Sequence, residues 1–593
     1  MKRSILYFLL PGFIFCLGSC KKYLEEKVVS NVSYQLYTTE KGIEGALTAA
    51  YNTFRLGVSG ERALTFSDAG TDLFTLGSDG NQPFNLYLGT LSSLEGKIND
   101  YWNYHYKGIS ECNLVTTYLP GVSMNESRKS VLAAEARFLR ALYYFDLVQH
   151  YGKVPLVLES SDKIITSFKR APISEIYEAV ISDLVYAYDQ LPITVTARGR
   201  ATKAAAAHQL AKVYMTRSSA ITAEQRLARG SKNTDLDSVI HYAGKIINKD
   251  LGNFSLVTDF ANLFDMKNQV NSEVIFAIQF TTDMLNNGSG NQMHLYHVPQ
   301  YDAINTKILA RSIEYGRPYR RVRPTPYVYN ELFGDTRKYD SRFAKSFYWA
   351  YLANKAANSI ETLAGNKVDV KVGDTAVYFT PEYFATDHDY TSATQLQNRF
   401  PYYFPLNFYL PFTRNYLFPG LKKWNDPLRP TTNETNGSRD WVVMRYAETL
   451  LLMAEAYGRK GDFESALPFI NQVRERAAYK TGELKTTQYW TFEGGRYEDR
   501  MLSTVGNMKV NVSNISGRFV DFILEERGRE FLGELNRWED LVRCEKLVER
   551  VLLYNPDAVN IRDFHVLRPI PQTHIDRLDP KGSPAEEQNI GYY

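Results

Sequence analysis

Residues 134–151, AEARFLRALYYFDLVQHY, carry the pattern that decides the fold. Phe138, Leu142 and Phe145 recur at i, i+4 and i+7, which places them on one face of a helix. Gly152 follows directly, and glycine commonly ends a helix. The stretch therefore predicts a long amphipathic helix.

Helical spacing returns on both sides of this stretch. Further helices are predicted over residues 174–191, 202–216 and 235–248. Apolar residues at the same spacing run from Val443 to Tyr457 and again from Ala466 to Ala477, with a glycine-containing turn between them. Two amphipathic helices joined by a tight turn are what a tetratricopeptide unit needs. We therefore expect a tetratricopeptide-like scaffold.

The middle of the chain has a different pattern. Residues 274–280 form a short β-rich run, and residues 367–379 alternate around a Gly373-Asp374 turn, which predicts a hairpin. Residues 285–440 are rich in Tyr, Pro, Asn and Gly, and their aromatic density argues for ordered loops. The predicted fold is mainly α: a tetratricopeptide-like helical scaffold with long irregular loops and short β-hairpins inserted.

The first twenty residues have the features of an export signal. Lys2 and Arg3 precede an apolar run that is shorter than the roughly 20 residues of a membrane-spanning helix. Leu17-Gly18-Ser19-Cys20 then resembles the bacterial lipobox, in which the cysteine is acylated; ordinary secretory cleavage is the alternative. We therefore expect a signal peptide over residues 1–19, a lipidated tether over 20–34 and a body over 35–593. Within the body we expect an N-terminal helical scaffold (35–260), a loop-rich insert (261–440) and a C-terminal region with a helical pair (441–593).

Composition narrows the function classes. The formal net charge is +3 with no run of like charges, which argues against a nucleic-acid partner. Beyond the signal and Cys20, only Cys112 and Cys544 remain, and their pairing stays open. Tyr, Phe and Trp make up 13% of the chain, with 42 Tyr. A tyrosine offers an apolar ring and a polar hydroxyl, which suits both sugar rings and protein interfaces.

Catalytic motifs are missing from the sequence. It contains no His-Glu-x-x-His, no phosphate loop, no Gly-x-Ser-x-Gly and no Cys-x-x-Cys, and no cofactor is predicted. Asp387-His388-Asp389 has potential metal ligands, but a solvated loop explains it better. Glu525, Glu526 and Glu530 lie on one predicted helix among arginines, which indicates a salt-bridged helix face and not a glycosidase acid and base.

Several motifs together resemble the SusD/RagB family. They occur in the family's order from residue 135 to the end, except that Ile590 stands where the family more often has Pro. The matching stretches are Glu135–Phe145 with Tyr151–Leu156, Gly199–Ala206 with Leu210–Tyr214, Arg445–Glu448 with Ala454–Ala456, Asn471–Arg474 with Arg476-Ala477, Glu525–Phe531, Asn536–Trp538 with Asp540-Leu541, Leu567–Pro571 and Gln588–Tyr592.

The resemblance implies an outer-membrane lipoprotein of the Bacteroidetes that has no catalytic activity. Such proteins act as the lid of a SusC-like TonB-dependent transporter and capture glycans, or less often peptides. Lys21-Lys22 and Glu25-Glu26 are similar to the segment that sends such lipoproteins to the cell surface. We therefore expect a nutrient-binding lipoprotein anchored in the outer membrane, facing the exterior. Two alternatives are a surface glycan hydrolase and an assembly protein that contacts only the transporter.

Three regions combine aromatic platforms with polar groups for sugar hydroxyls: residues 68–84, 99–104 and 296–327. Core packing or transporter contact is the alternative for each residue, and the helical spacing of Trp102 with Tyr106 and Ile109 favours core. The predicted ligand-binding residues are Asp72, Phe74, Asp79, Asn81, Asn99, Tyr101, Trp102, Tyr296, Tyr301, Tyr315, Arg317 and Tyr319.

Overall fold

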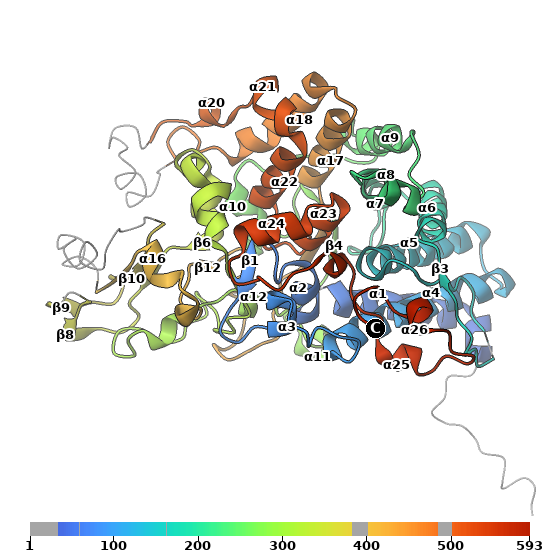
Figure 1. Ribbon diagram of the computed structural model, residues 1–593, viewed down its shortest axis with the longest axis horizontal. Helices are drawn as coiled ribbons and strands as arrows, with labels where there is room; N and C mark the ends of the chain where they lie inside the picture. Colours follow the sequence, from blue (N-terminus) through green and yellow to red (C-terminus); the bar gives the residue numbers. More distant parts are fainter. Residues whose placement is uncertain (1–33, 59, 162, 364, 382–400, 484–500) are drawn as a thin grey trace, which may run out of the picture.

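The computed structural model describes residues 34–58, 60–161, 163–363, 365–381, 401–483 and 501–593. Helices make up much of the molecule, and the small sheets are scattered through it: in Figure 1, β8, β9 and β10 lie at the left, β1 and β4 near the centre and β3 at the right. Cys20 and the segment Asp387-His388-Asp389 fall outside the described residues. The boundaries expected for the signal, the tether and the body stay predictions.

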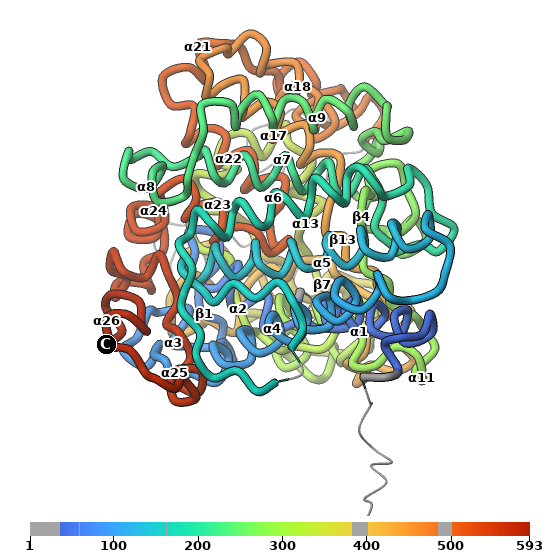
Figure 2. Tube along the Cα trace, turned by 90° about the vertical axis from the view of Figure 1, so that its right-hand side faces the viewer, coloured from blue at the N-terminus to red at the C-terminus, as the bar shows by residue number. Residues whose placement is uncertain are grey.

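Long helices from both ends of the chain form one continuous stack. Neighbours pack in the order α1, α4, α5, α6, α7, α9, α17 and α18, and Figure 2 shows most of them as successive rows from bottom to top. The helices of this stack, together with the short α2 and α3, are α1 (Glu40–Val58), α2 (Glu61–Ser67), α3 (Gln82–Leu86), α4 (Gly96–Tyr118), α5 (Glu126–Tyr151), α6 (Ile173–Gln190), α7 (Lys203–Ser218), α9 (Asp235–Ile247), α17 (Tyr446–Arg459) and α18 (Phe463–Ala477).

Helix α5 shows why this scaffold forms. Its N-terminus is capped by Asn125, whose side chain accepts the backbone N–H of Ser127 at 2.9 Å. It ends at Gly152, which has a φ of +67°, a conformation that costs glycine little. Most of the helix is buried, including the apolar positions that predicted it, because α4 and α6 cover it.

A buried arginine ties three of these helices together. Arg140 of α5 donates two hydrogen bonds to the carboxylate of Asp183 on α6, both at 2.8 Å. A third, also at 2.8 Å, goes to the side-chain oxygen of Asn113 on α4. The spacing of Arg140 also allows ion pairs within its own helix. Its partners instead lie on neighbouring helices, so its role is to fix helix packing.

Shorter elements complete the chain. The remaining helices are α8 (Ala223–Ala228), α10 (Phe260–Leu263), α11 (Met284–Asn287), α12 (Met293–Tyr296), α13 (Ser341–Ser346), α16 (Leu406–Tyr409), α20 (Val505–Met508), α21 (Val512–Ile515), α22 (Phe519–Glu530), α23 (Arg537–Arg543), α24 (Leu547–Tyr554), α25 (Gln572–Ile575) and α26 (Pro584–Glu587). The strands are β1 (Phe74–Leu76), β2 (Val154–Pro155), β3 (Arg170–Ala171), β4 (Val274–Ile278), β5 (Val322–Pro324), β6 (Phe347–Tyr348), β7 (Ala350–Leu352), β8 (Ala357–Glu361), β9 (Lys367–Val370), β10 (Thr375–Phe379), β11 (Tyr402–Phe404), β12 (Gly420–Leu421) and β13 (Trp441–Arg445).

Two predictions of secondary structure were wrong. The helix expected from Val443 begins only at Tyr446, because residues 441–445 pair antiparallel with β4 as β13. The hairpin expected within residues 367–379 does not form either, since β9 pairs with β8 while β10 pairs with β7 and β11. In both cases a partner distant in sequence overrides the local pattern.

A network of buried charges fastens α22 to the rest of the scaffold. Glu526 accepts hydrogen bonds from Arg342 at 2.8 Å and from Arg474 at 2.6 Å. Glu530 accepts from Arg342 at 2.9 Å, from Arg445 at 2.6 Å and from Arg476. This confirms that these glutamates form salt bridges, but most of their partners come from other elements.

Candidate ligand-binding face

The structure brings two of the three predicted regions together through one strand pair. β1 and β5 are antiparallel, with Phe74 opposite Pro324 and Leu76 opposite Val322. The loop after β1 therefore lies beside the loop before β5, and the backbone N–H of Gly77 donates to the carbonyl of Arg321. Both loops emerge on the same side of this small sheet.

Glu61, the first residue of α2, joins the third region to this pair. One of its carboxylate oxygens accepts from Lys97 of α4 at 3.0 Å, and the other accepts from Arg321 at 2.9 Å. Its neighbour Arg62 lies 4.1 Å from the ring centroid of Tyr104, also on α4. The loop 77–81, residues 95–104 and the loop 317–321 thus form one continuous surface, called the loop face below.

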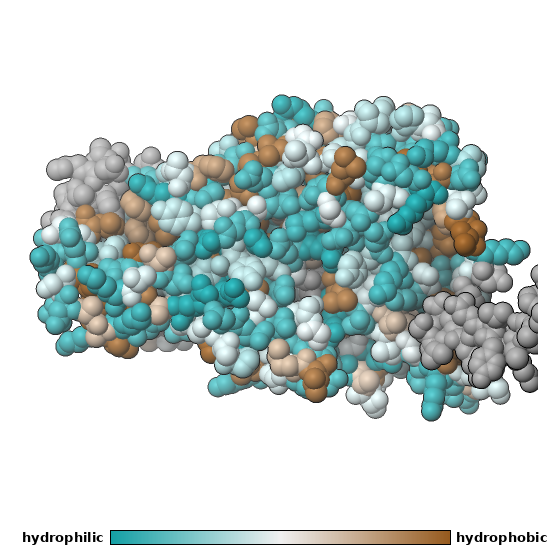
Figure 3. All heavy atoms as spheres, turned by 90° about the horizontal axis from the view of Figure 1, so that it is seen from below, coloured by the Kyte–Doolittle hydropathy of each residue, from teal (hydrophilic) through white to brown (hydrophobic). Residues whose placement is uncertain are grey.

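The exposed groups of the loop face are polar and already preorganised. The Asp79 carboxylate pairs with Arg320, whose Nε also donates to Ser78 at 2.8 Å. Asn81 caps α3 and donates to Glu95 at 3.1 Å. Figures 1 and 2 place α3 on the lower side of the molecule, and Figure 3 shows that side to be largely hydrophilic, with scattered hydrophobic groups.

Tyr319 is the aromatic residue of this face among those predicted. Its ring is half-buried and lies 5.3 Å from the guanidinium carbons of both Arg317 and Arg321. Arg317 is also held by a 2.9 Å hydrogen bond to the carbonyl of Asn433. The three side chains make a cation–π group at the edge of the loop face.

Other predicted ligand residues have different surroundings. Asn99 is half-buried and accepts from the hydroxyl of Thr573. Phe74 is buried against His297, with ring centroids 5.2 Å apart. Asp72 is fully buried, and its carboxylate accepts from Arg537 at 2.6 and 2.7 Å and from Arg550 at 2.8 Å. Phe74 and Asp72 therefore contribute packing and ion pairs inside the protein, while Asn99 is held at the surface by Thr573.

The remaining predicted aromatic residues are also buried. Tyr101 stacks on Phe66 with ring centroids 3.9 Å apart, and Trp102 packs edge-on against Tyr151. Burial of Trp102 agrees with the core alternative that its spacing favoured.

Three tyrosines of the region 296–327 direct their hydroxyls inward. The hydroxyl of Tyr296 donates to Gln292 at 2.9 Å and that of Tyr301 to the carbonyl of Gly316 at 2.9 Å. The hydroxyl of Tyr315 accepts the backbone N–H of Leu352 at 2.9 Å. They fix the loop before β5 from inside.

Sequence reasoning missed several residues of the loop face. Glu61, Arg62 and Lys97 are charged residues at helix starts and resemble any solvated helix end in the sequence. Ser78 and Arg320 lie inside the regions that were predicted, yet their pairing depends on the β1–β5 register. Only the spatial proximity of the two strands identifies them.

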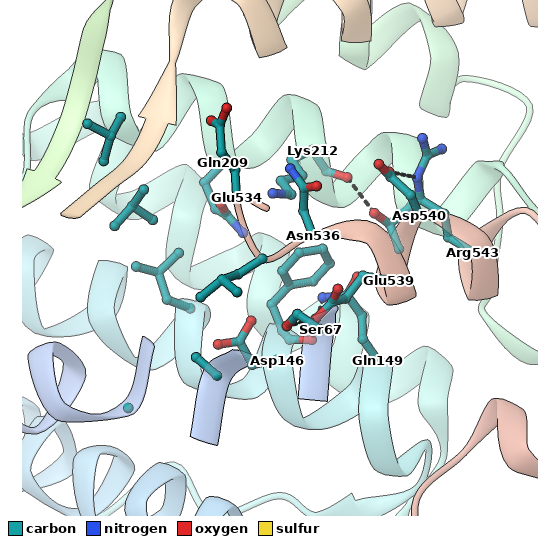
Figure 4. A pocket seen from close by; sticks show the side chains of 18 of the residues that line it. Ser67, Asp146, Gln149, Gln209, Lys212, Glu534, Asn536, Glu539, Asp540 and Arg543 are labelled. Carbon is teal, nitrogen blue, oxygen red and sulfur yellow. Dashed lines mark hydrogen bonds and ion pairs between the residues drawn. The ribbon is translucent and has the colours of Figure 1, made fainter. Parts of the chain in front are cut away.

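A separate cavity lies inside the helical stack. Figure 4 shows the polar side chains that line it, from α2, α5, α7 and the segment 534–543. Tyr101 belongs to residues 95–104, but its side chain is buried and lines this cavity. Its volume is about 130 Å³, below the roughly 300 Å³ at which small-molecule sites begin. The cavity is therefore a poor candidate for an oligosaccharide site.

One carboxyl beside this cavity has a displaced pKa. Burial, and next the carboxylate of Glu539, raise the pKa of Asp68 to about 8. An aspartate in the unfolded chain titrates near pH 3.9. The folded protein therefore keeps a proton that the unfolded chain releases, and stability falls as the pH rises from about 4 to about 8.

We expect Asp68→Asn to flatten this pH dependence, because the amide imitates the neutral carboxyl. Urea unfolding at pH 5, 6.5 and 8 measures the free energy of unfolding in each variant. Asp237→Asn, at an exposed aspartate of α9, serves as the control and should keep the wild-type profile. An Asp68→Asn variant that loses as much stability as the wild type between pH 5 and 8 would contradict the assignment.

A second, larger hollow lacks the aromatic wall that a sugar site needs. A groove of about 1600 Å³ lies between β3 and the C-terminal segment. Its aromatic lining consists of Phe168 and Phe564, without Tyr or Trp. Within the described residues there is no cluster of three or more metal-ligating side chains. Cys112 and Cys544 are buried free thiols.

Comparison with known proteins decides the family. The model of the SusD family matches residues 272–592, more than half of the chain. The chain belongs to the SusD family. A second model, described as starch-binding associating with outer membrane, matches residues 22–215. The resemblance seen in the motifs is thereby confirmed.

Relatives of this SusD-family chain cover nearly its whole length. SusD-like protein P25 of Formosa agariphila is 26% identical over 603 residues, covering 98% of each chain. SusD-like protein P2 of the same organism is 24% identical over 553 residues, covering 92% of this chain and 91% of the relative. Both alignments include the helical stack and the loops inserted in it.

Solved structures confirm the fold. A SusD homologue from Bacteroides thetaiotaomicron has a TM-score of 0.65 at 18% identity, covering 95% of this chain and 99% of the other. A laminarin-binding SusD-like protein has a TM-score of 0.60 at 22% identity, covering 93% and 100%. The expected mainly helical scaffold with inserted hairpins is therefore confirmed.

None of the described helices is long and apolar enough to cross a membrane.

Proposed function

We propose that this protein is a cell-surface lipoprotein that binds a nutrient glycan and acts as the lid of a SusC-like TonB-dependent transporter. The single observation that carries the proposal is the convergence of three separate chain regions on the loop face, in a member of the SusD family. One structural neighbour is titled a laminarin-binding SusD-like protein and another a surface glycan-binding protein.

The chemistry of the loop face suits an oligosaccharide. Asp79 and Asn81 offer oxygens that accept sugar hydroxyl protons, and Arg320 offers donors. Tyr319 supplies an aromatic surface next to them. Sugar sites combine such aromatic contacts with a small number of placed polar groups. We assign these four side chains, of which Asp79 is exposed and the other three are partly exposed, to glycan contact, and the buried members of the same regions to support.

The lipid anchor and the lid form the finer part of the proposal. Acylation of Cys20 would hold the body at the outer membrane, and the predicted tether, residues 20–34, would let the body close over the transporter mouth. Several acyl chains anchor durably, at about 0.8 kcal/mol per buried methylene. The ligand is an oligosaccharide or a peptide, and the loop face favours the oligosaccharide because its exposed groups match hydroxyls.

Calorimetric titration of the purified protein with a panel of polysaccharides tests the binding site. We expect Tyr319→Ala to weaken binding about fivefold, because an aromatic contact contributes about 1 kcal/mol. Asp79→Asn should weaken binding severalfold by removing an ionised acceptor. The matched control is Asp237→Asn, since Asp237 is also an exposed aspartate paired with a basic residue, Lys460.

Each alternative makes a different prediction. If no glycan or peptide binds while the purified transporter does, the protein is an assembly protein. If a polysaccharide is turned over, and one carboxylate variant abolishes the turnover, the protein is a hydrolase. Equal losses of affinity in Asp79→Asn and Asp237→Asn would remove the loop face from the proposal but leave glycan binding in place.

A further inference from the structure

The loop between β2 and β3 ends in an exposed apolar tip. Ile164 is 95% exposed and Ile165 is 47% exposed. Leu158, in the same loop, is also exposed. Isolated exposed apolar residues are ordinary on a protein surface, whereas adjacent isoleucines at the tip of a loop are a patch that needs a partner.

This tip lies next to the start of the described chain. Tyr37, in the 3-10 helix Tyr34–Thr38, lines a groove of about 600 Å³ together with Ile165 and Phe168. Cys20 precedes Tyr34 by fourteen residues, which span at most about 50 Å when fully extended. A lipid on Cys20 therefore keeps this part of the body within reach of the membrane.

One lysine lies in the tip and two lie at the base of the loop. Lys163 precedes Ile164, whereas Lys153 and Lys169 directly precede β2 and β3; all three are exposed, and in the described part of the chain none of them forms a salt bridge. An apolar tip with basic side chains at its start and at the base of its loop matches the interface of an anionic lipid layer, where side chains such as Ile enter the acyl boundary and ammonium groups remain at the head groups.

We propose that Ile164 and Ile165 insert into the outer surface of the membrane that holds the lipid anchor, while the three lysines bind its anionic head groups. The proposal rests on the lipid tether of the proposed function. Together with the anchor, the tip gives the body a second point of attachment, which restricts its rotation on the tether.

A lipid surface fits this patch better than a protein partner does. Protein interfaces concentrate their binding energy in Tyr, Trp and Arg, and the tip of this loop, residues 163–167, has none of these. The lysines also favour anionic head groups over an apolar protein surface. The transporter remains the partner that the experiment has to exclude.

The lipidated full chain allows a direct measurement. Ile164→Cys places a single reactive thiol at the tip, since Cys20 carries the lipid, and Cys112 and Cys544 are buried with the pKa of each thiol raised by that burial. The thiol is labelled with an environment-sensitive fluorophore. The protein is then reconstituted into vesicles of phosphatidylethanolamine and phosphatidylglycerol that contain a nitroxide-labelled lipid.

The matched control is Leu227→Cys. Leu227 is 82% exposed on α8, which lies in the upper half of Figures 1 and 2. We expect quenching at position 164 to be at least twofold stronger than at position 227. Ile165→Ser, added to the Ile164→Cys protein, should reduce that quenching at least twofold because it removes an apolar side chain from the tip. Vesicles of phosphatidylcholine should also reduce it, because they lack anionic head groups.

Two outcomes overturn the proposal. Equal quenching at both positions means that the body adsorbs without a preferred face. If the fluorophore at position 164 is not quenched in vesicles, and becomes shielded from solvent only when the transporter is present, the tip binds the transporter. The quenching result does not depend on glycan binding, so a failed titration would leave it unchanged. Mass spectrometry of the purified chain reports separately whether Cys20 is acylated.

Discussion

Replacing Glu530 with glutamine is expected to lower the free energy of unfolding by about 3–5 kcal/mol, the range seen when a buried ion pair loses one partner. Glu530 is fully buried and accepts hydrogen bonds from three arginines on three different elements. Glutamine keeps the shape and one acceptor but removes the charge. Arg342, Arg445 and Arg476 then each lose one of their buried carboxylate partners, keeping Glu526 or Glu273, and one amide N–H₂ faces donors.

The neighbouring residue provides the control. Glu525 lies on the same helix and pairs with the exposed Arg518. We expect Glu525→Gln to change stability by less than about 0.5 kcal/mol, because surface pairs contribute little. Urea unfolding of the two variants measures the difference. Similar losses of unfolding free energy in both variants would mean that the buried network around Glu530 stabilises α22 no more than a surface ion pair does.

Acid should act on the same network. Burial by itself would raise the pKa of Glu530, but Arg476, Arg445 and Arg342 hold it well below its usual value. The carboxylate therefore contributes stability above about pH 4.3, the pKa of glutamate in an unfolded chain, and this contribution is lost as the pH falls toward the folded pKa. In Glu530→Gln we expect a smaller loss of stability below pH 4 than in the wild type.

Cys20→Ala is expected to have the largest effect on function. Without the thiol there is no site for acylation, and no described helix replaces the anchor. The protein should leave the outer-membrane fraction, and uptake of its nutrient should fall. Membrane fractionation with immunoblotting, together with growth on the glycan as sole carbon source, measures both effects.

A second cysteine makes the matched control. Cys16 lies on the discarded side of the predicted cleavage, so Cys16→Ala should leave localisation and growth unchanged. If Cys20→Ala stays in the outer-membrane fraction, the lipidation prediction is wrong. If growth continues while the protein is mislocalised, the lid role is wrong.

The sequence predicted those parts of the fold that depend on local spacing. Helices α6, α7 and α9 match their predicted ranges closely because their apolar residues recur at helical intervals, whereas α5 begins eight residues before its predicted start at residue 134. Val443 has the same spacing, yet it lies in β13, where its neighbours pair with β4. Single-sequence periodicity cannot register a partner strand more than 160 residues away.

The sequence predicted the regions that form the candidate site better than it predicted the individual residues. The structure joins all three regions around Glu61. Most of the individual aromatic residues are buried, as Tyr301 and Trp102 illustrate. A tyrosine that supports a loop from within and one that faces solvent have the same sequence signature, and burial is decided only by the packing of distant elements.

The ion pairs of Asp72 have a consequence for the order in which the chain can fold. The aspartate lies just before β1, and its two arginine partners follow more than 460 residues later. A nascent chain that has not yet reached Arg537 leaves a carboxylate without counterions in the interior, an arrangement that costs several kcal/mol. The strand that carries the loop face therefore settles late, after synthesis is nearly complete. Contacts so distant in sequence also make folding slow. An N-terminal fragment produced alone would lack Arg537 and Arg550, and with them the ion pairs that hold the strand beside its loop face.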